Sequence, residues 1–150
     1  MLLQKEIDML RLYLDLEQLR FSDKLTYLIT IDENINPDNI LIPSMLIQPY
    51  VENAILHGIM HKETEGFVEV RFKLFESWIE ITIEDNGIGR DRSKTYKSKT
   101  THNSLSMEIT NKRLQRLKHD DITHAGITII DLKDGRHECT GTKVIIEVPL

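Results

Sequence analysis

The chain has 150 residues, of which 40% are hydrophobic and 29% charged, and its formal net charge is -5 at pH 7. This length and balance fit one soluble globular domain with a sizeable core, and the acidic charge argues against a nucleic-acid partner. No apolar run is long enough to cross a bilayer, and the single cysteine, Cys139, excludes an intrachain disulfide, so we expect a cytoplasmic domain without membrane contact.

A helical pattern and then a strand pattern open the chain. Residues 2–20 repeat apolar side chains three or four positions apart, which predicts one amphipathic helix. The repeating positions are Leu3, Ile7, Leu10 and Leu14. Residues 24–32 place Leu25 and Tyr27 on one face of a β-rich segment and predict the first strand.

Residues 46–58 combine an apolar helical face with a polar one. Ser44 is a candidate cap for this helix, and Pro49 marks either a kink or the first turn. Asn53 and His57 share the polar face, where Asn53 offers a carbonyl oxygen to a hard cation and His57 a ring that can donate to an anion. The alternative is an amphipathic helix whose polar residues face water. The opposite face gathers the apolar positions Ile47, Val51, Ala54, Ile55 and Gly58.

Two further polar residues lie close to this pair in the sequence. Glu52 directly precedes Asn53, about 100° around the helix, so it lies either at the edge of a site or in solvent. His57 and His61 have the i, i+4 spacing of a zinc pair, but no cysteine or third histidine stands at ligand spacing. The sequence therefore predicts no zinc site.

A second group of chemically distinctive residues follows two predicted antiparallel strands, residues 67–75 and 78–84. The segment 85–89 reads Asp-Asn-Gly-Ile-Gly, and Asn-Gly is typical of a hairpin turn. Residues 90–103, however, show no period-2 apolar pattern that could form the returning strand. This leaves a carboxylate at a strand end beside two glycines that let the backbone approach a ligand closely.

These two segments resemble the motifs of a known family. Residues 48–58, Gln-Pro-Tyr-Val-Glu-Asn-Ala-Ile-Leu-His-Gly, are similar to the N box of sensor histidine kinases of the LytS type, and residues 85–89 to their G1 box. The resemblance implies the GHKL (HATPase) domain with the Bergerat ATP-binding fold. This is an α/β (α+β) two-layer sandwich with helices on one face of a mixed, mostly antiparallel sheet. Residues 1–20 would end a dimerisation or linker helix, and residues 21–150 would form the ATPase domain.

The resemblance also implies roles for the residues of the first box. Asn53 would hold Mg²⁺ on the phosphates of ATP, His57 would orient the γ-phosphate or the attacking group, and Glu52 is a second catalytic candidate. The family's acceptor histidine lies upstream in an Asn-Pro-His-Phe-type motif. The first histidine of this chain is His57, so the acceptor is expected outside these 150 residues.

The second box and the last strand would bind the base. Asp85 would accept a hydrogen bond from the adenine amino group, while Gly87 and Gly89 make room for base and ribose. Thr142, in a strand that follows Gly141, either reaches the adenine end of the pocket or is an ordinary strand residue.

The stretch between residues 90 and 103 is rich in cations, which suits a lid over a triphosphate or a solvated loop. The resemblance places the ATP lid here. A helix is expected from a cap at Ser104 to Leu117. The resemblance places Ser104 and Ser106 in the G2 box, among the nucleotide-binding residues, although the family usually has glycine at the second position and often at the first. Serine there would weaken phosphate binding or add a hydroxyl donor.

The last predicted unit is a hairpin of residues 126–132 and 138–148 around Asp134-Gly135. For the longer protein the resemblance implies a homodimer anchored in a bacterial membrane, with ATP, upstream histidine-phosphotransfer helices and a response regulator as partners. An alternative is a non-catalytic nucleotide-binding or interaction module of the same fold, favoured by Ser106 and by Leu56 where a lysine is usual. Hydrolysis would require a glutamate at the position of Pro49.

Overall fold

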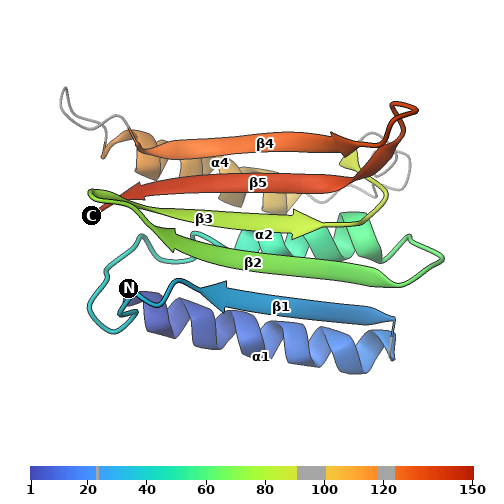
Figure 1. Ribbon diagram of the computed structural model, residues 1–150, viewed down its shortest axis with the longest axis horizontal. Coiled ribbons are helices and arrows are strands. Elements are labelled where there is room, and N and C mark those ends of the chain that lie inside the picture. The colour runs from blue at the N-terminus through green and yellow to red at the C-terminus, as the bar shows by residue number, and fades with distance from the viewer. Residues whose placement is uncertain (23, 91–100, 118–123) are drawn as a thin grey trace.

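The computed structural model describes residues 1–22, 24–90, 101–117 and 124–150. One mixed sheet is formed by the strands β1 (Leu25–Ile31), β2 (Gly66–Leu74), β3 (Trp78–Asp85), β4 (Gly126–Lys133) and β5 (Cys139–Pro149). The strand order is β1-β2-β3-β5-β4 (Figure 1), in which β1 pairs with β2 in parallel and the other neighbours are antiparallel. The helices are α1 (Leu3–Phe21), α2 (Gln48–Asn53) and α4 (Thr101–Gln115), and a π-helical segment, η1 (Ala54–Ile59), continues α2.

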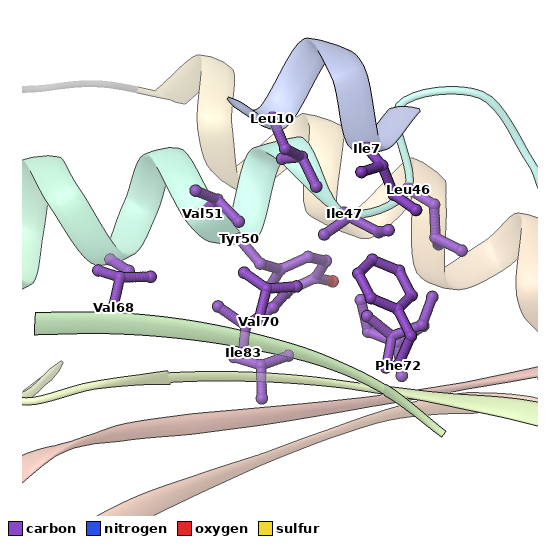
Figure 2. Close-up of a cluster of buried hydrophobic side chains, with 14 of the residues drawn as sticks. Ile7, Leu10, Leu46, Ile47, Tyr50, Val51, Val68, Val70, Phe72 and Ile83 are labelled. Atoms are coloured by element: carbon purple, nitrogen blue, oxygen red, sulfur yellow. The ribbon is translucent and has the colours of Figure 1, made fainter. Parts of the chain in front are cut away.

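The helices cover one face of the sheet, and the apolar side chains between the two layers form the core. Figure 2 shows Ile7 and Leu10 of α1 on the same side as Ile47 and Val51, all directed towards the sheet. The sheet contributes Val68, Val70, Phe72 and Ile83 to this core. The two-layer α/β sandwich expected from the sequence is therefore confirmed. Of the helices that the structure describes, none has the length and apolarity needed to cross a bilayer.

Helix α1 packs into the same core as the rest of the domain. Its side chains Leu3, Ile7, Leu10 and Leu14 are fully buried. The predicted helix and the predicted first strand are confirmed within one residue at each end. The division of the chain at residue 20 stays a prediction.

Replacing Leu10 with alanine tests the contribution of α1. We expect the free energy of unfolding to fall by about 2–5 kcal/mol, because the side chain leaves a cavity in a packed core. Leu12→Ala on the same helix is the control, since Leu12 is 63% exposed and its loss should change stability by no more than about 0.5 kcal/mol. Urea unfolding followed by circular dichroism compares the two variants, and equal midpoints would show that the burial of Leu10 adds nothing to the stability of the fold.

The helix that carries Asn53 begins later than the sequence suggests. It starts at Gln48 with Pro49 in its first turn, and Ser44 lies in a turn four residues earlier, so the predicted serine cap is wrong. The amide of Ile47 instead donates a hydrogen bond to the carboxylate of Glu6 on α1. From Ala54 the backbone is π-helical, a geometry that often occurs at functional sites and that apolar periodicity does not reveal.

One further local expectation is wrong and another is confirmed. Helix α4 begins at Thr101, so Ser104 lies within its first turns and is not its cap. The predicted β4–β5 hairpin is confirmed, with residues 134–138 as its connection. Asp134 closes it by accepting hydrogen bonds from the amides of Arg136 at 2.8 Å and Glu138 at 3.1 Å. His137, not Gly135, has the left-handed conformation, with φ 61°.

Candidate functional site

A buried carboxylate lies at the end of β3. Asp85 is 6% exposed, and its Oδ1 accepts a hydrogen bond of 2.8 Å from the amide of Gly87. Burial raises the pKa of the carboxyl to about 6, and the amides of Gly87 and Thr142 oppose that rise. Thr142 pairs with Asp85 across the antiparallel β3–β5 ladder, which explains how two residues 57 positions apart share one site. A buried carboxylate of this kind can accept a hydrogen bond from a ligand.

The helical segment α2–η1 lies against this strand end. Its apolar face is buried as expected, while Asn53 and His57 are half-buried. Gly58 lies so close to the strand end that a Cβ there would come within 3.0 Å of Asp85 Oδ1. Its carbonyl accepts a hydrogen bond of 3.1 Å from the amide of Ile88. The absence of a side chain at residue 58 thus lets the helix approach the carboxylate.

Five of the predicted site residues line one small cavity: Asn53, His57, Asp85, Gly89 and Thr142. Ala54, Gly58 and Arg90 complete its lining. The sequence analysis assigned Ala54 and Gly58 to a packing face and Arg90 to a loop. Only the position of Gly58, directly after His57, indicated that one of them could lie at the site. The cavity measures about 20 Å³, which is room for water and not for a nucleoside. A nucleotide would therefore require a wider opening than this conformation has.

The remaining predicted residues lie elsewhere or are only partly described. Glu52 lines a separate cavity between α2 and α4, where its Oε1 accepts a hydrogen bond of 3.0 Å from Gln48. The backbones of Ser104 and Ser106 lie in α4, but their side chains are outside the described residues. The same holds for residues 91–100 of the predicted lid. The roles of these residues stay predictions.

The two glycines of the second motif pack against other parts of the protein. A Cβ on Gly87 would overlap the backbone of Gly58. Gly89 has φ 86°, and a Cβ there would overlap the sulfur of Cys139. The sequence predicted that the backbone approaches a ligand closely at both glycines. In the structure both glycines instead lie close to other residues of the same chain. Their approach to a ligand stays a prediction.

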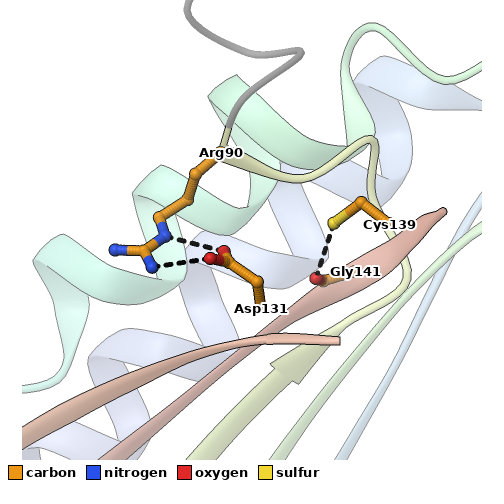
Figure 3. Close-up of polar contacts among 4 residues, drawn as sticks. All are labelled: Arg90, Asp131, Cys139 and Gly141. Atoms are coloured by element: carbon orange, nitrogen blue, oxygen red, sulfur yellow. Dashed lines mark hydrogen bonds and ion pairs between the residues drawn. The ribbon is translucent and has the colours of Figure 1, made fainter. Parts of the chain in front are cut away.

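One of the residues that line the cavity, Arg90, forms an ion pair. Arg90 donates from Nε and Nη2 to the two carboxylate oxygens of Asp131 on β4, each at 2.8 Å, as Figure 3 shows. Beside it, the thiol of Cys139 donates to the carbonyl of Gly141 at 3.3 Å. Arg90 thus brings a cationic group to the cavity that Asp85 also lines.

The donor set at the cavity suits one class of metal ion. In the part of the chain that the structure describes, no three histidine, cysteine or acidic side chains are grouped as a protein cage for a metal would require. Asn53 alone brings an amide oxygen to a cavity that also contains His57. Mg²⁺ commonly binds through one or two protein oxygens together with substrate phosphates and water, so these residues fit it.

Comparisons with known proteins identify relatives of the sequence. The family model described as "Histidine kinase-, DNA gyrase B-, and HSP90-like ATPase" matches residues 41–150. Sensor histidine kinase YpdA of Escherichia coli (strain K12) is 42% identical over 89 residues, which are 59% of this chain and 15% of that protein. Sensor protein LytS of Staphylococcus haemolyticus (strain JCSC1435) is 37% identical over 92 residues, 61% of this chain and 15% of that protein. The chain spans less than half the length of these curated relatives.

Solved structures share the fold. The catalytic domain of histidine kinase ThkA superposes with a TM-score of 0.63 at 14% identity, covering 99% of this chain and 94% of that chain. The blue-light activated histidine kinase of Erythrobacter litoralis EL346 superposes with a TM-score of 0.64 at 16% identity, covering 99% of this chain and 42% of that chain. At these identities the likeness concerns the fold alone.

Proposed function

Since the chain belongs to the family of histidine kinase-, DNA gyrase B- and HSP90-like ATPases, as its resemblance to the LytS type led us to expect, we propose that it is the catalytic, ATP-binding domain of a sensor histidine kinase. In this proposal it binds Mg-ATP and the γ-phosphate passes to a histidine outside residues 1–150. The single observation that carries the proposal is the convergence of Asn53, His57, Asp85 and Thr142 on one cavity.

The buried carboxylate would select the base. Asp85 has one oxygen bound to the amide of Gly87, and it would accept a hydrogen bond from the adenine amino group with the other. Thr142, its neighbour across the sheet, would contact the same end of the base. A base without an amino group at that position would lose this hydrogen bond to a buried carboxylate, so this pair would favour adenine over such a base.

The helical segment would hold the phosphates. Asn53 would bind Mg²⁺ through its amide oxygen, and His57 on the next turn would orient the γ-phosphate or the attacking group. The ion, when bound, supplies charge neutralisation on the phosphates. Arg90 lines the same cavity, and on leaving Asp131 it would pair with a phosphate. Glu52, Ser104 and Ser106 remain candidates for catalysis and phosphate binding.

The same proposal covers the partners of the domain and the longer protein to which it would belong. Its partners would be ATP, upstream dimerisation and histidine-phosphotransfer helices, and a response regulator. The whole protein would be a homodimer anchored in a bacterial membrane, with this domain in the cytoplasm. The names of two bacterial relatives, sensor histidine kinase and sensor protein, support the sensor kinase, while the dimer and the membrane anchor rest on the family resemblance alone.

Calorimetric titration with ATP, once in the presence of Mg²⁺ and once in the presence of a chelator, tests the site. Wild type should bind Mg-ATP at micromolar strength, which is on the order of -8 kcal/mol. Asn53→Ala should weaken binding by about 10- to 100-fold, because a charge-assisted contact is lost, and should make the remaining binding indifferent to Mg²⁺. Asn39→Ala, in an exposed turn outside the cavity, is the matched control and should bind as wild type does.

The other outcomes separate the alternatives. No heat with millimolar ATP would refute the proposal and favour a non-catalytic interaction module of the same fold. ATP binding without phosphotransfer, once upstream helices with an acceptor histidine are supplied, would favour a non-catalytic nucleotide sensor. Stable radiolabel on the 150-residue chain alone would contradict the placement of the acceptor outside it.

A further inference from the structure

Helix α1 carries a buried acid that the proposed chemistry does not use. Glu6 is fully buried among the apolar residues of α1, next to Ile7 and near Leu3 and Leu10. Burial raises the pKa of its carboxyl, and the amides of Ile47, Gln48 and Leu46 oppose that rise. A buried carboxylate without partners is costly, so the position of these amides explains how the acid is accommodated.

The contact lies at the start of the helix that carries the nucleotide-site residues. The amide of Ile47 donates to Glu6 Oε1 at 2.5 Å. The first amides of a helix have no partner within it, and isoleucine has no side-chain oxygen that could cap them. The cap therefore comes from residue 6, on a different helix and 41 positions earlier in the chain. The positive end of the helix dipole also favours a carboxylate at this place.

This cap lies on the same continuous helical segment as Asn53 and His57. Asn53 follows Ile47 by six residues, which is about 9 Å along a helix. Apolar contacts between α1 and α2 are non-directional and would tolerate sliding. The hydrogen bond to Glu6 has a defined length and direction, so it fixes where the segment lies along α1.

We propose that Glu6 is a positioning residue of the nucleotide site: it ties α1 to the start of α2 and thereby sets the position of Asn53 and His57. A shift of α1 along its axis would move this anchor, so α1 has a direct mechanical connection to the site. The inference rests on the proposed function of these two residues, but the connection itself can be measured without ATP.

The geometry of Glu6 defines the variants. Only Oε1 accepts a hydrogen bond, while Oε2 makes none with the described residues. Glu6→Gln can keep an oxygen in the place of Oε1 and put its amide nitrogen where Oε2 was. It should therefore retain the hydrogen bond from the amide of Ile47. Glu6→Leu removes the acceptor at similar volume. Glu6→Asp keeps the charge but shortens the reach by one methylene, and it replaces Glu6→Leu should that variant fail to fold. Leu14→Ala destabilises the same helix without touching the cap.

The first readout is nuclear magnetic resonance of the ligand-free domain. Glu6→Leu or Glu6→Asp should shift the side-chain amide signal of Asn53 and the ring signals of His57, whereas Glu6→Gln and Leu14→Ala should leave both near their wild-type positions. The second readout is Mg-ATP affinity at a temperature where each variant is folded. We expect a loss of about tenfold for Glu6→Leu or Glu6→Asp and less than about threefold for the other two variants.

The outcomes are separable. Wild-type signals at Asn53 and His57 in folded Glu6→Leu or Glu6→Asp would overturn the inference, and so would equal effects of Leu14→Ala. If wild type binds no Mg-ATP, the proposed function fails, and the resonance shifts alone then decide whether Glu6 positions the segment.

Discussion

Asp85→Asn is expected to abolish ATP binding while making the ligand-free domain more stable at neutral pH. The pKa of Asp85 is raised from 3.8 to about 6 because the carboxyl is buried. Folded protein therefore keeps this proton up to about pH 6, while unfolded protein releases it near its ordinary pKa. The stabilisation that this bound proton gives the folded state is fully present below the ordinary pKa. It is lost as the pH rises to about 6, and the loss is on the order of 3 kcal/mol.

Asparagine is neutral at every pH and can keep the hydrogen bond from the amide of Gly87. At pH 7.5 the variant should exceed wild type by up to about 3 kcal/mol in free energy of unfolding, and the two should converge near pH 3.5. ATP affinity should fall by on the order of 100-fold or more, because the asparagine amide would present a donor to the adenine amino group.

Urea unfolding between pH 3.5 and 8, together with calorimetry, measures both effects. Asp38→Asn makes the same charge change at an exposed position and should leave stability and binding nearly unchanged. A variant at residue 85 that is less stable than wild type at pH 7.5 would contradict the buried, destabilised carboxylate. Retained ATP affinity would contradict its role towards adenine.

Gly87→Ala should have a large effect on the fold near the site. The added Cβ would meet the backbone of Gly58 and the carboxylate of Asp85. Backbone atoms cannot rotate away as a side chain can, so η1 and the strand end would have to separate. We expect a loss of about 3 kcal/mol in free energy of unfolding, the upper part of the range for overpacked positions. Nucleotide binding should fall with it, because the same displacement moves His57 away from Asp85.

Gly135→Ala is the control for this substitution. Gly135 lies in the β4–β5 connection with open space around it, so an added methyl group meets nothing. Its stability should stay within about 0.5 kcal/mol of wild type or rise slightly, since alanine reduces the freedom of the unfolded chain. Equal urea midpoints for the two variants would show that the contact between Gly87 and Gly58 carries no strain.

Much of the fold follows from local sequence patterns. Alternating apolar residues predicted the strands, and helical spacing predicted the buried face of α1. No strand pattern follows Asn-Gly, so the sequence also placed the end of β3 at Asp85. The apolar face of residues 47–58 was also predictable, because helical spacing places these side chains on one side of the segment. Asn53 and Asp85 were candidates because one lies on the polar face of a helix and the other at the end of a strand, whereas Thr142 became a candidate through the family resemblance. The structure brings the three to one cavity, and their roles stay predictions.

Contacts between distant residues could not be predicted in this way. Glu6 reads as a solvent-facing acid in a helical pattern, and its partner Ile47 lies 41 positions later. Arg90 and Asp131 are likewise 41 positions apart. Ser44 had the right residue type for a cap at the wrong distance from the helix start. The π-helical geometry of η1 leaves no mark on apolar spacing, since it changes the turn only locally.

The parallel pairing of β1 with β2 has a consequence for pieces of this chain. The matched family region begins at residue 41, yet residues 25–31 pair with residues 66–72 along the whole of β1. A piece that began at residue 41 would leave β2 as an unpaired edge rich in valine and phenylalanine. Such an edge is a template for pairing between molecules. Residues 1–40 therefore cover this edge of β2, and we expect a piece without them to associate with itself more readily than the whole chain does.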